Sequence, residues 1–217
     1  MTLIDLSHPL GPAMPSYPGV PEPQFHTLFT HEQSAARGNY APGTTFQIAT
    51  YEIAGNTGTY VDAPFHRHPG LADLAKLPLD RLANLPAIVV VVAPEGAIEL
   101  ATFTGLEVRG KAVLLHSGWA QRWGGDYFRS GPYLTVAACE GLVAAGALLV
   151  GIDCANIDDM ADKSRPAHTI LLGAGIPIIE HLCNLEQLPA EGSRFFAVPP
   201  AIEGGTSFPV RAFAIVE

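Results

Sequence analysis

The stretch KAVLLHSGWAQRWGGDYFRSGPYLTVAACEGLVAAGALLVGIDC, residues 111–154, indicates the fold class of this chain. It opens with an apolar run that ends in the polar residues His116 and Ser117, as a buried strand does. LTVAACEGLVAAG is then typical of an amphipathic helix closed by Gly146, and ALLVGIDC predicts the next buried strand. Together these segments predict a βαβ-like unit.

Further strands flank this unit on both sides. TTFQIATYEIAG alternates and is rich in β-branched and aromatic residues, which predicts a strand through Ile53. AIVVVVAP predicts a strand buried on both faces, and LADLAKLPLDRL predicts a short helix broken at Pro78. HTILLGAGIPIIEHL predicts a helix or strand pair around Gly175, and FFAVPP and VRAFAIVE predict two closing strands. The mixture indicates an α/β or α+β fold with a substantial sheet.

The composition indicates one globular domain over residues 1–217. Apolar residues make up 48% of the chain and charged residues 15%, which excludes disorder. The first thirty residues carry six of the nineteen prolines, so we expect residues 1–30 to form an extended N-terminal arm. The net charge of −9 makes nucleic acid an unlikely partner. We expect no membrane span and no targeting segment, and therefore a cytoplasmic protein.

The three cysteines, Cys139, Cys154 and Cys183, are widely spaced in apolar surroundings. This pattern predicts buried packing residues. A nucleophilic role for Cys154 is the less favoured alternative.

Acidic and histidine residues cluster at the predicted strand ends. They are Asp62, His66, Asp153, Asp158, His168 and Glu180. Imidazole and carboxylate groups are ligands for divalent cations, and Asp62, His168 and Glu180 together could hold one. Each residue also has a simpler interpretation: Asp62 as a turn aspartate, His66 and His68 as solvated loop residues. Asp153 and Asp158 could likewise be capping or turn residues.

Motifs along almost the whole chain resemble those of the cyclase family, which includes bacterial kynurenine formamidase and isatin hydrolase. The motifs, in order, are TLIDLSHPL, YPGVP, NTGTYVDAPFH, HSGWAQRWG, GPYLTVAACEGL, GIDCANIDD, AHTILLGAGIPIIEHLCNLEQLP and FPVRAFAIVE. The resemblance implies a swivelling β/β/α domain with a mixed central sheet flanked by helices. It also implies a homodimer or homotetramer and hydrolysis of an amide, lactam or similar bond by metal-activated water.

The resemblance implies site residues as well. The family motif, which begins His-x-Gly-Thr-His-x-Asp-x-Pro, places Asp62 on a metal-ligand aspartate, and the resemblance places His66, two residues after Pro64, on the proposed catalytic histidine. The downstream metal ligands fall on His168 and Glu180. The two early ligand histidines are replaced here by Asn56 and Tyr60.

These departures change the expected metal. An asparagine offers a neutral carbonyl oxygen, and a tyrosine phenol ionises only near pH ~10, so zinc should bind less well. A surviving ion would sit on Asp62, His168 and Glu180, with Asn56 as a possible ligand, and this oxygen-rich set favours Mn²⁺ or Mg²⁺ over Zn²⁺. Asn156 stands where the family usually has serine.

The leading hypothesis is a hydrolase acting on a carbon–nitrogen or cyclic ester bond of a small cyclic or aromatic molecule. His66 would be the acid/base, with Tyr60 in the vacated position or as a donor to the substrate carbonyl. The aromatic residues that could line the pocket are Tyr17, Phe25, Phe65 and Trp119, although Trp119 could equally be a core residue. Asn56 and Asn156 are candidate substrate contacts.

Two metal-free alternatives remain open. One is a small-ligand-binding protein in which Tyr60 and Asn56 bind the ligand and the carboxylates pair with Arg165 or Arg211. The other is a lyase or isomerase that uses His66 and Tyr60 as an acid/base pair.

Overall fold

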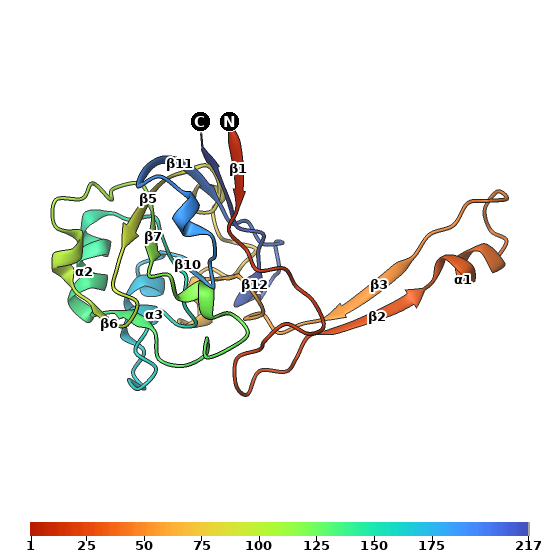
Figure 1. Ribbon diagram of the computed structural model, residues 1–217, viewed down its shortest axis with the longest axis horizontal. Helices are drawn as coiled ribbons and strands as arrows, with labels where there is room; N and C mark the ends of the chain where they lie inside the picture. Colours follow the sequence, from red (N-terminus) through yellow and green to blue (C-terminus); the bar gives the residue numbers. More distant parts are fainter. Residues whose placement is uncertain (217) are drawn as a thin grey trace.

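A nine-stranded mixed sheet runs through the body of the protein (Figure 1). The computed structural model describes residues 1–216, so Glu217, the end of the predicted closing strand, lies outside the described residues. In order across the sheet, the strands are β1 (Thr2–Asp5), β13 (Phe213–Val216), β11 (Glu191–Phe196), β5 (Leu85–Val91), β7 (Ala112–His116), β9 (Leu149–Ile152), β10 (Ile178–Glu180), β4 (Tyr60–Asp62) and β12 (Ser207–Pro209).

The centre of this sheet contains the predicted βαβ-like unit. β5, β7, β9 and β10 pair in parallel, and helix α2 (Val136–Ala145) connects β7 to β9. The Thr135 hydroxyl accepts a hydrogen bond from the Ala138 amide at the start of α2, and Gly146 ends the helix with a φ of 82°. The predicted helix boundaries are therefore confirmed.

Both faces of the central strands are buried, as their continuous apolar runs predict. In β7, Val113 and Leu115 pack into a core beneath α2 and helix α3 (Pro166–Gly173). Ala112 and Leu114 point into a second core on the opposite face, which loops cover. The mixed sheet with helices confirms the predicted fold class.

The helix predicted in LADLAKLPLDRL is wrong. This segment forms turns and a short 3₁₀ helix at Leu79–Arg81, directly after Pro78. Proline has no amide hydrogen to donate and cannot continue a helix that begins before it. The apolar spacing instead places Leu74, Leu77 and Leu82 in the second core, so burial rather than helix formation explains the pattern.

The N-terminal segment differs from the predicted arm. Thr2–Asp5 forms an edge strand paired with β13, and the part that projects from the body continues past residue 30. This projecting hairpin consists of β2 (Gln24–Phe29), α1 (His31–Ala36) and β3 (Ile48–Glu52), which is the predicted strand near Ile53 (Figure 1). A second small sheet pairs β6 (Gly96–Ile98) with β8 (Pro132–Leu134).

Within residues 1–216, no helix has both the length and the apolar character needed to cross a bilayer.

Candidate active site

Strand pairing brings the first part of the site together. β4 and β10 are antiparallel neighbours, with Tyr60 opposite Glu180 and Asp62 opposite Ile178. Because side chains alternate along a strand, Tyr60, Asp62 and Glu180 share one face of the sheet. A short 3₁₀ helix, Pro64–His66, follows β4 and adds His66. Asp62 is therefore a buried strand residue, and its interpretation as a turn aspartate is wrong.

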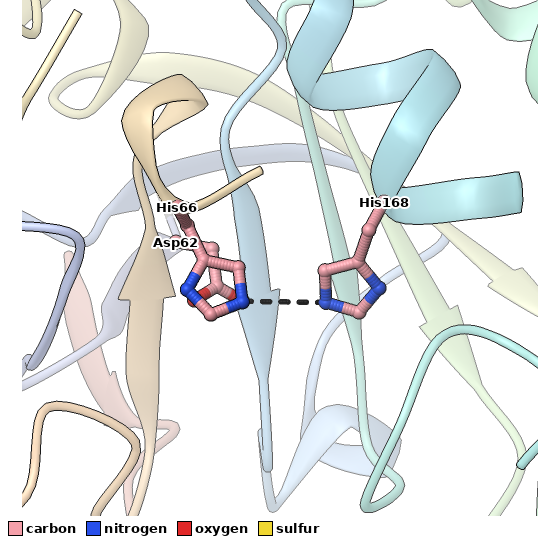
Figure 2. A group of neighbouring side chains, drawn as sticks. All are labelled: Asp62, His66 and His168. Carbon is pink, nitrogen blue, oxygen red and sulfur yellow. Dashed lines mark ion pairs between the residues drawn. The ribbon is translucent and has the colours of Figure 1, made fainter. Parts of the chain in front are cut away.

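Helix α3 brings His168 to the same place. Asp62, His66 and His168 each offer one ligand atom, and these atoms lie within 4.8 Å of one another, so they form a candidate metal site. In Figure 2, the imidazole rings of His66 and His168 face each other, with Asp62 behind the His66 ring. The Nε2 atom of His168 lies 3.6 Å from Asp62 Oδ2.

Asp158 fixes the orientation of the His168 ring. Its Oδ2 atom accepts a hydrogen bond of 2.6 Å from His168 Nδ1, and its two oxygens accept from the amides of Ala167 and His168. Asp158 thus stabilises the start of α3, as the capping interpretation predicted, and directs Nε2 into the site. Burial disfavours the charged imidazole, but the hydrogen bond to Asp158 and the proximity of the Asp62 and Glu180 carboxylates outweigh it and raise the pKa of His168 to about 10.

Glu180 has partners for both of its oxygens. Oε1 accepts a 2.7 Å hydrogen bond from the amide of Ile157, and Oε2 accepts one from the Tyr60 hydroxyl. Glu180 Oε1 also lies 3.8 Å from His168 Nε2, beside the candidate metal site. Burial raises the pKa of Glu180 to about 7, and burial together with the carboxylates Glu180 and Asp62 raises the pKa of Tyr60, so the phenol stays protonated.

Asp62 has one oxygen that is satisfied and one that is not. Oδ1 accepts from Ser207 Oγ at 2.5 Å and from Asn56 Nδ2 at 3.4 Å, whereas Oδ2 is buried without a hydrogen-bond partner. A buried carboxylate oxygen without a partner is costly, and a cation between Asp62 and His168 would satisfy it. The donor set therefore fits a divalent ion. Burial opposes ionisation, but His168 and His66 outweigh it and keep the pKa of Asp62 below its usual range.

Ser207 also contacts His66. Its Oγ lies 3.1 Å from His66 Nδ1, and its single hydrogen is directed at Asp62. Ser207 then accepts a hydrogen bond from His66 Nδ1–H, and in the neutral imidazole this tautomer leaves Nε2 without a hydrogen and available. Ser207 follows Thr206 in a polar stretch with no motif, so the sequence offered no signal for this contact.

Tyr60, His66, His168 and Glu180 line a pocket of about 200 Å³. Its lining residues are Tyr17, Val20, Asn56, Tyr60, His66, Ala155, Asn156, Arg165, His168, Glu180 and His181. Asn56, Asn156 and Tyr17 therefore line the same pocket as His66 and His168. A larger hollow of about 740 Å³ beside β12 is lined by residues such as Pro200 and Phe208, away from the carboxylate and histidine cluster.

Three predicted contacts lie elsewhere. Trp119 is buried in the core, where its Nε1 donates to the Tyr127 carbonyl at 2.9 Å. Phe25 packs against Tyr51 in the hairpin, and Phe65 is outside the pocket lining. Trp119 packs with apolar side chains of the core, and these contacts, rather than its position after a strand end, determine where it lies.

Three further outcomes concern charged and sulfur groups. His181 is buried against Tyr60, its Nε2 lies 3.3 Å from the Ala155 carbonyl oxygen, and burial lowers its pKa to about 3. All three cysteines are buried as predicted, and burial raises the pKa of Cys154 well above its usual value, which argues against a nucleophile. Arg211 pairs with Asp5, so the expected pairing of Arg211 with the site carboxylates is wrong.

Comparisons with known proteins agree with this fold. Residues 4–159 match the family model described as "Putative cyclase". The kynurenine formamidase of Salinibacter ruber is 28% identical over 214 residues, covering 98% of this chain and 96% of that protein. Isatin hydrolase A from Labrenzia aggregata superposes with a TM-score of 0.86 at 24% identity, covering 99% of this chain and 93% of that one. A structure described as a potential metal-dependent hydrolase with cyclase activity superposes with a TM-score of 0.78 at 24% identity, covering 98% and 96%.

Proposed function

The chain belongs to the cyclase family, and we propose that it is a metal-dependent hydrolase of a small aromatic or cyclic substrate. The bond cleaved would be the carbon–nitrogen bond of an amide or lactam, with lactones as a further class. One observation carries this proposal: the unpartnered, buried Oδ2 of Asp62 lies 3.6 Å from the Nε2 atom of His168. The similarity to a kynurenine formamidase supports amide cleavage.

Asp62 and His168 would hold the ion, with Glu180 as the third ligand. Glu180 Oε1 is close to His168 Nε2, and a carboxylate oxygen that accepts one hydrogen bond keeps a second lone pair. When bound, a divalent ion would polarise the substrate carbonyl and lower the pKa of water. The carboxylate-rich set favours Mn²⁺ or Mg²⁺ over Zn²⁺.

His66 would act as the acid/base. Its Nδ1–H is held by Ser207, so Nε2 would take a proton from the attacking water and later deliver it to the leaving nitrogen. Tyr60 would remain protonated and hold Glu180 in place. The grouping of His66 with Asp62 and His168 also supports a different role, in which His66 is itself the third ligand.

A metal-free site is the second candidate, because each of the two carboxylates already accepts a hydrogen bond from a residue at a variant position. Tyr60 donates to Glu180 and Asn56 donates to Asp62, at the positions where the resemblance implies lost metal ligands. Such a site would serve either ligand binding or acid/base chemistry through His66 and Tyr60.

The first experiment measures metal content and turnover in the same set of variants. Wild-type protein should hold about one divalent ion per chain and hydrolyse aryl formamides, isatin-like lactams or lactones. His66→Ala should keep the ion and lose at least ~100-fold in kcat, as expected for removing an acid/base group. Glu180→Gln should lose the ion. Lys76→Ala, at a position on the body whose side chain is 75% exposed, is the control.

The outcomes separate the roles of these residues. Loss of metal from His66→Ala would make His66 a ligand rather than an acid/base. Wild-type protein that binds no ion, and whose melting temperature is unmoved by Mn²⁺, Zn²⁺ or EDTA, would rule out the metal-dependent hydrolase.

A further inference from the structure

Arg165 occupies an unusual position in the wall of the pocket. It is the N-cap residue of α3, three residues before His168, and its φ of 51° is left-handed. Non-glycine residues seldom adopt this conformation, and strained positions of this kind concentrate at functional sites. Arg165 is partly buried and lines the pocket together with His66 and His168.

The charge of Arg165 has no acidic partner. Its Nη1 donates to the carbonyl of Asp159 at 3.3 Å, and no carboxylate among residues 1–216 forms an ion pair with it within 4.0 Å. Arg122, Arg129 and Arg211 each pair with a carboxylate, whereas Arg165 and the other arginines do not within the described part of the chain, and of these unpaired arginines only Arg165 lines the pocket.

The nearby carboxylates are engaged elsewhere. Asp158 accepts from His168 Nδ1 and from two amides of α3, so it is not available to Arg165. Asp162 is exposed and accepts from the amide and the hydroxyl of Ser164 at 2.8 and 2.7 Å; these bonds lower its pKa, with a smaller contribution from the charge of Arg165, but the two side chains form no ion pair. A partly buried guanidinium without an acidic partner is uncommon, because buried charges are normally paired.

Arg165 also offsets an unfavourable field. The chain carries a net charge of −9, Glu180 lines the pocket and Asp62 lies behind its wall beside His168, so an anionic ligand would otherwise be repelled. Arg165 is the only arginine or lysine among the pocket-lining residues. It is therefore the permanent cation that an anion entering this pocket would meet.

From this geometry we infer that Arg165 binds a carboxylate group on the substrate. A guanidinium and a carboxylate form two parallel hydrogen bonds, which fixes orientation as well as adding affinity. Tyr17 and Val20 on the same pocket supply apolar contact for the ring of an aryl substrate. The site would thus take a small aromatic amide that carries a carboxylate, held by Arg165 at one end and presented to His66 at the other. This inference rests on the proposed function.

The test compares charged and neutral substrates. The 2-, 3- and 4-formamidobenzoates carry the carboxylate at different places on the ring, and formanilide is their neutral counterpart. For the best formamidobenzoate, Arg165→Gln should raise KM about tenfold or more, whereas the KM for formanilide should change by less than about twofold. Arg165→Lys keeps the charge without the planar guanidinium, so its KM for the formamidobenzoate should lie between those of the wild type and Arg165→Gln. Arg194→Gln on β11, an exposed position away from the pocket, is the matched control.

Binding of benzoate, measured by calorimetry with benzamide as the neutral probe, needs no turnover. If no substrate is hydrolysed, the hydrolase proposal fails, yet benzoate binding that is lost in Arg165→Gln would still support the carboxylate site. The inference is overturned if wild-type protein prefers neither formamidobenzoates nor benzoate over the neutral probes. It is equally overturned if Arg165→Gln impairs formanilide and the formamidobenzoates alike.

Discussion

Ser207 joins Asp62, the proposed metal ligand, to His66, the proposed acid/base, through one hydroxyl group. It donates to Asp62 Oδ1 and lies 3.1 Å from His66 Nδ1, so a single rotamer sets both the aspartate orientation and the histidine tautomer. Without the hydroxyl, the His66 ring could rotate and the proton could move to Nε2. That tautomer cannot accept a proton from water.

We therefore predict that Ser207→Ala lowers kcat by roughly 10- to 100-fold, the range found when residues that orient metal-site ligands are removed. Ser207→Thr, which keeps the hydroxyl, should recover most of the activity. Ser193→Ala is the control, because Ser193 is a buried serine on β11 whose Oγ has no partner. If kcat survives in Ser207→Ala, or if threonine gives no recovery, Ser207 does not orient His66.

The sequence predicted some residues of the candidate site and missed others. Asp62, His168 and Glu180 were grouped from their residue types, and the resemblance gave His66 its expected role; the four lie close together although more than a hundred positions separate Asp62 from His168. Ser207 and His181 were missed. Ser207 belongs to no motif and acquires its role only because β12 pairs with β4. His181 lies among apolar residues in the sequence and acquires its role only because it is buried near β4. The distances that decide the role of His66 cannot be read from spacing in the chain.

At the scale of elements, the segment after β1 packs on the loop that follows β7. His8 stacks on Trp123 with ring centroids 3.8 Å apart, and its Nε2 is buried without a hydrogen-bond partner. Burial lowers the pKa of His8 from 6.5 to about 4, so the imidazole is neutral in the folded protein near neutral pH.

This shift predicts an acid-sensitive contact. Between pH 6.5 and about 4, the unfolded chain binds a proton at His8 and the folded chain does not, so the free energy of unfolding falls as the pH falls. Relative to His8→Phe, wild-type protein should lose on the order of 1–2 kcal/mol over this range, allowing for solvent screening at a partly exposed ring. Urea unfolding of both proteins at pH 8, 6 and 4 measures the difference. A difference that stays constant from pH 8 to 4 would show that His8 is not held neutral.

Elements were predictable where burial alone determines them. The runs that became β5, β7 and β9 and the glycine-terminated helix α2 carry their signal in consecutive residues. The strands β4 and β12 are three residues long, and their pairing depends on partners far along the chain, so no local pattern marks them. The failed helix around Pro78 shows that a helical spacing of leucines can also arise from a buried loop.

At the scale of the whole molecule, the hairpin of β2, α1 and β3 stands away from the body (Figure 1). Its two strands form a separate sheet, and a two-stranded hairpin is at best marginally stable in water. Its surface includes three exposed apolar side chains, which are Leu28, Ile48 and Tyr51. Leaving these groups in solvent forfeits the free energy of burying them, which contact with another copy of the chain would supply.

We therefore predict that the protein is a homo-oligomer in which the hairpin is covered by a second copy. Sedimentation equilibrium at micromolar concentration should give at least a dimer, and the double variant Leu28→Asp, Tyr51→Asp should dissociate it because each charge would be buried in the contact. Leu79→Asp is the control, since Leu79 is 67% exposed on the body and its substitution should leave the assembly intact. A monomeric wild type, or a Leu79 variant that dissociates equally, would contradict this role. If the double variant is a folded monomer with a lower melting temperature, then the hairpin depends on its partner for stability, as the isolated two-stranded sheet implies.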